Sequence, residues 1–160
     1  MKKIPSLLSA LVVLSVSAVA QKVIKDVRPD THESWLVTDD VDLNFRIIQS
    51  GAIFTHFRTE GAAIFMYISG PGQLSARDYA YFVTDQDTVM IYSTGDQPGG
   101  WNGNNPYHEY SMTKEVLVYL SKHPIKQVTV SHYGGWQVTN IPAKDQSRLM
   151  PYCNAVLSNL

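Results

Sequence analysis

Five histidines are the side chains of this sequence best suited to binding a transition metal: His32, His56, His108, His123 and His132. A helical zinc site of the H-E-x-x-H type needs a second histidine three positions after His108-Glu109, and Met112 stands there instead. The two closest histidines, His123 and His132, lie on either side of a predicted helix end and a strand. The spacing therefore predicts no metal site and no cofactor, and it favours surface and helix-end positions for these side chains.

Asp85 and Asp87 have the spacing with which a calcium-binding loop begins. Such a loop needs an oxygen ligand two positions later and a glycine after it, but Val89 and Met90 occupy these places. Asp85-Gln86-Asp87 is instead typical of the connection in a β-hairpin.

The motifs of nucleophilic catalysis are missing from this sequence. It has no G-x-S-x-G, and Cys153, the only cysteine, falls on the apolar face of a predicted helix, where we expect it to be buried. The turn Gly70-Pro71-Gly72 lacks an N–H donor that a phosphate cradle would use. These observations favour a non-catalytic protein. The alternative is a small hydrolase or metal-dependent enzyme that uses the 94–110 segment, with His108 beside Glu109 or Asp96.

Aromatic residues gather in two places and are the stronger indication of function. Trp101, Tyr107, His108 and Tyr110 belong to a segment rich in Gly, Asn and Pro, from Thr94 to Tyr110, which we predict to be an irregular loop. Tyr133 and Trp136 flank a predicted hairpin tip. Amphipathic rings in such places could bind an envelope protein, a peptide or a glycan, or could insert into a partner enzyme as an inhibitor does. The alternative is that these rings pack back onto the end of the sheet, which is the commoner arrangement of aromatic residues in a monomer.

The N-terminal residues read as a secretory signal peptide. Lys2 and Lys3 precede a short apolar run from Leu7 to Val16, and Ala18-Val19-Ala20 fits a signal-peptidase site. The run is shorter than the roughly 20 residues that a membrane-spanning helix needs, so we expect cleavage after Ala20 and no transmembrane segment in the mature chain. Because Gln21 follows, lipoprotein processing is not predicted. The protein is expected to be secreted, most simply to the periplasm.

Composition is that of a globular domain. The 160 residues include 13 Lys and Arg, 14 Asp and Glu, and 44% hydrophobic residues. Loss of Lys2 and Lys3 with the leader makes the mature chain mildly acidic, and no basic footprint for a nucleic acid is present.

The elements that position these residues are mostly strands. Val41 to Ile47 alternates apolar and polar residues, and further β-type runs follow at 53–59, 63–68, 79–84 and 89–93, with turn residues between them. The charged segment 21–34 shows no period and is expected to be an extended or mobile lead-in.

The C-terminal half predicts helix, hairpin and helix. Ser111 is the expected N-cap of a helix with Glu115 in its first turn that stops before Pro124. Residues 125–132 and 136–141 form a hairpin, with Gly134-Gly135 as its loop and Tyr133 facing Trp136. Val128, Val130 and Ile141 then share the core face.

The last predicted helix carries Leu149 and Cys153 on its apolar face, and Pro151 should kink it or mark its start. Strands followed by helix, hairpin and helix predict an α+β fold. The fold is a largely antiparallel sheet, a meander of about five to seven strands, with two helices packed on one face. The domains are therefore a signal peptide (1–20), the lead-in (21–34) and a single α+β domain (35–160). A mixed sheet would result if the first helix joined two neighbouring strands.

Overall fold

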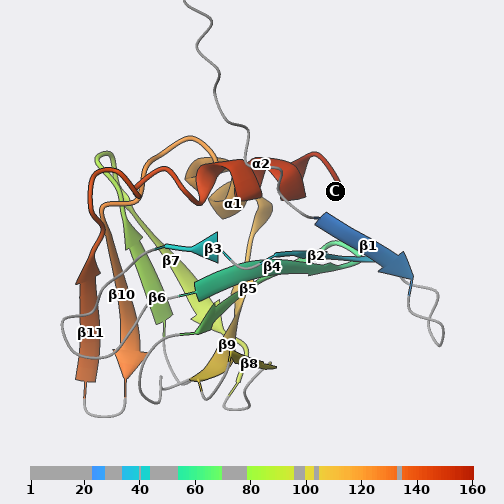
Figure 1. The fold of residues 1–160 in the computed structure, drawn as a ribbon, viewed down its shortest axis with the longest axis horizontal. Helices are drawn as coiled ribbons and strands as arrows, with labels where there is room; N and C mark the ends of the chain where they lie inside the picture. Colours follow the sequence, from blue (N-terminus) through green and yellow to red (C-terminus); the bar gives the residue numbers. More distant parts are fainter. Residues whose placement is uncertain are drawn as a thin grey trace, which may run out of the picture.

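The computed structural model describes residues 23–27, 34–39, 41–43, 54–69, 79–95, 100–102, 105–132 and 135–160. These residues form eleven strands and two helices (Figure 1). The strands are β1 (Val23–Val27), β2 (Ser34–Thr38), β3 (Val41–Asp42), β4 (Phe54–Glu60), β5 (Ala63–Ser69), β6 (Tyr79–Val83), β7 (Thr88–Ser93), β8 (Gly100–Asn102), β9 (Asn105–Met112), β10 (Gln127–His132) and β11 (Gly135–Asn140). The helices are α1 (Lys114–Leu120) and α2 (Met150–Leu157). The predicted signal peptide lies outside the described residues.

The described strands form one antiparallel sheet in the order β1, β2, β4, β5, β9, β7, β6, β10, β11, with β3 beside β4 and β8 beside β9. The predicted α+β fold with a largely antiparallel sheet is therefore confirmed. The order departs from a simple meander, because β9 lies between β5 and β7. The mixed-sheet alternative does not arise among these strands: α1 leads from β9 to β10, and β7 and β6 lie between those two strands.

The N-terminal segment adds strands to the sheet that the sequence did not reveal. β1 lies within the predicted lead-in and pairs with β2 along its whole length, from Val23 opposite Thr38 to Val27 opposite Ser34. β3 begins the alternating run that starts at Val41, the buried Leu43 follows it, and the rest of that run lies outside the described residues. The predicted strands at 53–59, 63–68, 79–84 and 89–93 match β4, β5, β6 and β7.

The segment from Thr94 to Tyr110 was predicted to be irregular, and this prediction was wrong. Its second half forms β9, which pairs with β5 from Tyr107 to Met112. The physical reason is an alternation that the polar residue types conceal: His108, Tyr110 and Met112 are buried, whereas Ser111 between them is exposed. A histidine and a tyrosine occupy core-facing positions of β9, so a search for alternating aliphatic residues misses this strand.

Helix α1 begins two residues later than predicted. Thr113, not Ser111, is the N-cap, and its hydroxyl accepts a hydrogen bond from the Val116 N–H at 3.3 Å. Ser111 cannot cap the helix because it still belongs to β9, where it lies opposite Phe65 and Tyr92. The sheet therefore sets the start of the helix.

Helix α2 begins at Met150, and Pro151 stands in its first turn, as the sequence predicted. Leu149, Cys153 and Val156 are buried, which confirms the core position expected for the cysteine. Burial raises the pKa of the Cys153 thiol, so the group stays protonated and acts as a small apolar side chain.

The hairpin of β10 and β11 differs from the prediction by one residue in its loop. Ser131 lies opposite Trp136 and His132 opposite Gly135, so the connecting residues are 133 and 134 rather than Gly134-Gly135. Each residue of β10 therefore faces a partner two positions earlier than predicted. A shift of two keeps every side chain on its face, so Val128, Val130 and Ile141 are buried together as expected.

The core lies between one face of the sheet and the two helices. Figure 1 shows α1 and α2 on the same side of the sheet; they contact each other, and α2 also contacts β2. A single cluster of buried apolar residues joins β2, β4, β5, β6, β7, β9 and β10 to both helices. No helix among the described residues is long and apolar enough to cross a membrane.

Candidate functional site

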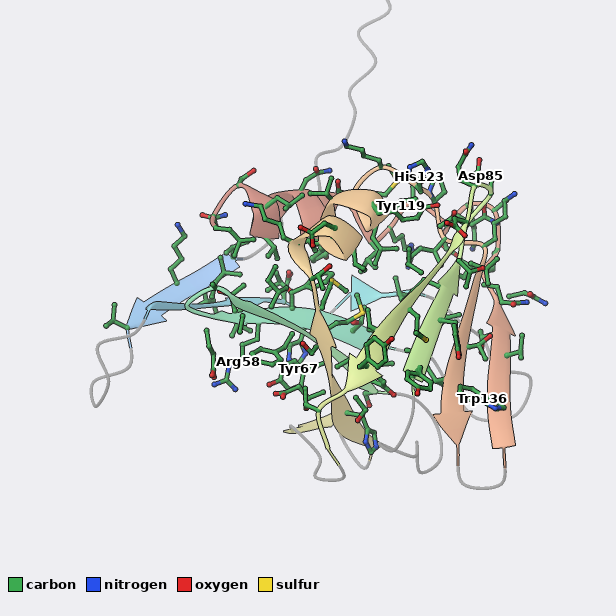
Figure 2. The ribbon with its side chains drawn as sticks, turned by 180° about the vertical axis from the view of Figure 1, so that it is seen from behind. Arg58, Tyr67, Asp85, Tyr119, His123 and Trp136 are labelled. Atoms are coloured by element: carbon green, nitrogen blue, oxygen red, sulfur yellow. The ribbon has the colours of Figure 1, made fainter. Side chains whose placement is uncertain are left out.

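The sheet has a second face, turned away from the helices, which we call the outer face. On β6, Ala80 and Phe82 are buried in the core, so Tyr79 and Tyr81 lie on the outer face. The same alternation places Tyr92 of β7 there, next to the buried Ile91. Figure 2 shows Arg58 and Tyr67 on this side of the sheet, with the helices on the other.

Four rings contact one another on the outer face and form what we call the aromatic cluster: Tyr79, Tyr81, Tyr92 and Trp136. Tyr79 and Tyr92 are directly opposite each other on β6 and β7, and their rings meet edge to face with centroids 5.0 Å apart. Tyr81 lies 6.1 Å from Tyr79 and 5.5 Å from Trp136 between ring centroids. Pairs at these separations and tilts attract each other beyond the effect of burial alone, so the cluster is held in place by its own contacts.

The contact between Tyr81 and Trp136 spans β10, which separates β6 from β11. The positions of β10 between them are Thr129, opposite Tyr81, and Ser131, opposite Trp136. The two rings therefore meet diagonally across the intervening strand.

The aromatic cluster is open to solvent at both ends. Tyr92 is 54% exposed and Trp136 is 50% exposed, and the neighbouring Val138 of β11 is 56% exposed. Rings with an apolar body and a polar tip, half exposed and adjoining an aliphatic side chain, are the composition found where proteins bind partners.

The residues predicted to bind a partner are distributed over both faces of the sheet. Trp136 is exposed and belongs to the aromatic cluster. His108 and Tyr110 lie in the core and present nothing to solvent. Trp101 and Tyr107 are placed on β8 and β9, and their side chains, like Tyr133 as a whole, lie outside what the structure describes.

His108 is buried, and its ring nitrogens make no hydrogen bond to the described residues. Its side chain is 5% exposed. Desolvation lowers the pKa of His108, so the ring is neutral in the folded protein. Glu109 follows on the opposite face of β9, so the structure does not bring these two side chains together. Asp96, the other partner considered for His108, lies outside the described residues.

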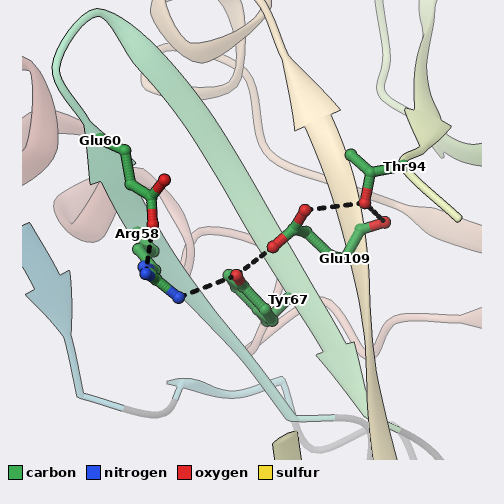
Figure 3. Close-up of polar contacts among 5 residues, drawn as sticks. All are labelled: Arg58, Glu60, Tyr67, Thr94 and Glu109. Carbon is green, nitrogen blue, oxygen red and sulfur yellow. Dashed lines mark hydrogen bonds and ion pairs between the residues drawn. The ribbon is translucent and has the colours of Figure 1, made fainter. Parts of the chain in front are cut away.

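A chain of polar contacts lies on the outer face next to the aromatic cluster (Figure 3). Arg58 pairs with Glu60 and also donates from Nη1 to the hydroxyl oxygen of Tyr67 at 3.5 Å. Tyr67 donates its phenolic hydrogen to Oε2 of Glu109, and Thr94 Oγ1 donates to Oε1 of the same carboxylate at 2.7 Å. This polar chain fastens β4, β5, β9 and the residue after β7 to one another.

Tyr67 is the centre of the polar chain. It is only 2% exposed, and His56 stacks on its ring with centroids 4.7 Å apart and planes 9° from parallel. Burial, and after it the hydrogen bond to the Glu109 carboxylate, raises the pKa of Tyr67 to about 12. The phenol therefore stays protonated at neutral pH and serves as a donor.

Both oxygens of the Glu109 carboxylate accept hydrogen bonds within the polar chain. A carboxylate engaged in this way holds neighbouring strands together. No group of three or more His, Cys, Asp or Glu side chains with the geometry of a metal site occurs within the ranges that the structure describes. The aromatic cluster, exposed at Tyr92 and Trp136, is the candidate contact surface on the described part of the outer face.

Asp85 and Asp87 lie in a hairpin connection, as predicted. The Thr84 N–H donates to the Asp87 carbonyl at 2.9 Å, and Thr84 Oγ1 accepts from the N–H groups of Gln86 and Asp87. The hydroxyl of Tyr119 in α1 lies 2.8 Å from the same Thr84 oxygen, so the hairpin tip is fixed to the helix.

Sequence reasoning missed three of the four members of the aromatic cluster. Tyr79 and Tyr81 alternate with Ala80 and Phe82, which gives a strand with one apolar and one amphipathic face, and this signal could have placed both rings outside. Their proximity to Trp136 depends on the strand order. No protein-family model, curated protein or solved structure matches this chain.

Proposed function

We propose that this protein is a non-catalytic binding protein of the cell envelope and that the aromatic cluster, with Val138 beside it, is its contact surface. The single observation that carries the proposal is the exposure of Tyr92, Trp136 and Val138 at 50% or more within one contiguous patch. An apolar patch that water covers in the free protein gains free energy when a partner covers it.

The geometry of the rings favours a protein partner over a glycan. A sugar stacks on a flat ring face, whereas Tyr79 and Tyr92 are 81° from parallel and Tyr81 and Trp136 are 57° from parallel. Rings at such angles, next to an aliphatic side chain, offer an uneven surface that interlocks with the side chains of another protein. Their mutual contacts also reduce the side-chain entropy that is lost on binding.

The envelope location rests on the N-terminal residues. Lys2 and Lys3, the apolar run from Leu7 to Val16 and the Ala18-Val19-Ala20 site support export with cleavage after Ala20. Mass spectrometry of the protein purified from a periplasmic fraction tests this part. A mature chain that begins at Gln21 is the expected result, and retention of the full leader in the cytoplasm contradicts it.

The binding surface is tested by capture from an envelope extract with matched variants. Trp136→Ala and Tyr92→Ala each remove an exposed ring and are expected to lose the partner that the unaltered protein retains, since aromatic anchors dominate contact energies. Ile24→Ala, which removes an apolar side chain 45% exposed at the opposite edge of the sheet, is the control and should retain it.

A partner retained by both ring variants would remove the aromatic cluster from consideration. A glycan array probed with the same three variants tests the other ligand class. Binding of a glycan that is lost only in the ring variants would replace the protein partner by a carbohydrate.

A further inference from the structure

Among the described strands β11 is an edge of the sheet, and no described strand pairs with its outer side. The Ile141 N–H donates to the Lys126 carbonyl at 2.8 Å, toward β10. Because the direction of backbone groups alternates along a strand, the N–H and C=O groups of Trp136, Val138 and Asn140 point away from β10 toward the open edge. Three alternate residues of β11 are thus ready to pair with another strand.

Among the described residues no strand pairs with the outer side of β11, and its own sequence lacks the usual protection against edge pairing. Natural edges carry lysine, proline, bulges or a covering element, because an open flat edge recruits other strands. β11 reads Gly-Trp-Gln-Val-Thr-Asn, with no charge and no proline, and Trp136 and Val138 are exposed on it. At the other edge of the sheet, β1 carries the exposed Lys25 at its centre. The two edges therefore differ in the feature that controls association.

We propose that β11 pairs with β11 of a second copy of this chain, in antiparallel orientation about a two-fold axis, so that the two sheets become one. The strand is compatible with its own copy because it is uncharged and no like charges meet across the axis. Pairing of the same strand with itself is also a closed contact, which stops at a dimer. Pairing of β11 with the charged edge β1 of another copy would continue into an open chain.

One register satisfies the open backbone groups in full. If Val138 lies opposite its own copy, Trp136 lies opposite Asn140 of the second copy, and all three outward-pointing residues exchange backbone hydrogen bonds. The two-fold axis is perpendicular to the sheet in this arrangement, so both outer faces lie on the same side. The aromatic clusters of the two copies then adjoin each other across the new pair of strands.

The side chain of Asn140 is held by a hydrogen bond that is compatible with this register. Its Oδ1 accepts a hydrogen bond from Gln127 Nε2 of β10 at 2.9 Å, which holds the side chain toward β10 and leaves the outward backbone groups uncovered. The ring of Trp136 likewise leans toward Tyr81 of β6, over the sheet and away from the edge. The open edge is therefore free of its own side chains at both ends of the proposed pairing.

Sedimentation and light scattering on the mature protein test the proposal through Val138. Val138→Pro removes the N–H that points outward, so no backbone bond to β10 is lost, and it is expected to raise the dissociation constant of the dimer about tenfold or more, since two equivalent bonds disappear. Val138→Lys, which places two like charges across the axis, should have the same effect. Val138→Thr keeps both shape and N–H and is the matched control that stays dimeric.

Amide hydrogen exchange gives a readout specific to the edge. The amides of Trp136, Val138 and Asn140 are expected to exchange slowly in the dimer and rapidly in Val138→Lys, while the amide of Thr139, directed toward β10, stays protected in both. Unchanged thermal unfolding of the variants, measured in dilute solution, establishes that they are folded.

Three results overturn the proposal. A wild-type protein that is monomeric at every concentration does so, and so does a dimer that survives both Val138→Pro and Val138→Lys. A monomer whose capture of an envelope partner is lost in Val138→Pro but kept in Val138→Thr would assign the edge to a strand of another protein. The proposed binding function stands apart from this inference, because Tyr92→Ala should lose the partner and leave the dimer intact.

Discussion

Tyr67 donates its phenolic hydrogen to the carboxylate of Glu109, 42 residues further along the chain, from the position directly opposite it in the sheet. In sequence, β6, β7 and β8 lie between β5 and β9, so this bond joins two neighbouring strands that are far apart along the chain. Arg58 and Thr94 complete the contacts around the pair. The relationship stabilises the junction at which the strand order departs from a meander.

Removing the Tyr67 hydroxyl should therefore destabilise the fold. Tyr67→Phe leaves the Glu109 carboxylate without one of its donors in a partly buried place, which costs about 1–3 kcal/mol. The free energy of unfolding in urea measures this loss. Tyr92→Phe removes a hydroxyl from an exposed ring on the same face and should change the free energy by less than about 0.5 kcal/mol. Equal effects of the two variants would contradict the role given to the polar chain.

The raised pKa of Tyr67 predicts a loss of stability at alkaline pH. In the unfolded chain the phenol ionises near its ordinary value of 10.0, whereas in the folded protein the pKa is about 12. Between these values only the unfolded state loses the proton, so the free energy of unfolding falls as pH rises from 10 to 12, by at most about 1.4 kcal/mol per pH unit. Chemical denaturation across this range, compared with Tyr67→Phe, should show a steeper decline in the protein that retains the hydroxyl.

His108 predicts the opposite pH dependence. Its pKa is lowered by burial, so below the ordinary value of 6.5 the unfolded chain takes up a proton that the folded chain resists. The free energy of unfolding therefore falls as pH drops below 6.5, and above 6.5 this residue contributes no pH dependence. His108→Phe removes the titrating group while filling the core position, and should flatten the stability profile between pH 6.5 and 5. A parallel profile in the variant would show that other groups cause the acid sensitivity.

The position of the N-cap of α1 predicts different stability effects for substitutions of Thr113 and Ser111. Thr113→Ala removes the N-cap and should destabilise the protein by about 1 kcal/mol, because the Val116 N–H loses its acceptor. Ser111→Ala alters an exposed position on β9 and should cost less than about 0.5 kcal/mol. Thermal and urea unfolding of both variants measure the difference, and a larger loss from Ser111→Ala would restore the sequence-based assignment of the cap.

The buried histidine illustrates why sequence reasoning placed part of the site wrongly in space. His108 and Tyr110 were predicted at a binding surface because polar and aromatic residues in a Gly-rich and Asn-rich segment are typical of one. In the structure they occupy core positions opposite Ile68 and Met66 of β5. The residue types of His108 and Tyr110 do not show which strand lies beside β9. Only the neighbouring strand decides which side of β9 faces the core. Trp136 needed no such information, because it follows a hairpin tip.

Local patterns determined much of this protein. Alternation along the strands, the stop before Pro124, the start of α2 near Pro151 and the burial of Cys153 follow from short-range periodicity and backbone chemistry, which depend on neighbours in the chain. The tertiary structure decided the position of β9 between β5 and β7, the contact of Tyr81 with Trp136 across β10, and the polar chain through Tyr67. These relationships join residues far apart in the sequence, and they depend on strand order and register. Strand order is fixed by the packing of the whole core, since no single segment buries its apolar face alone.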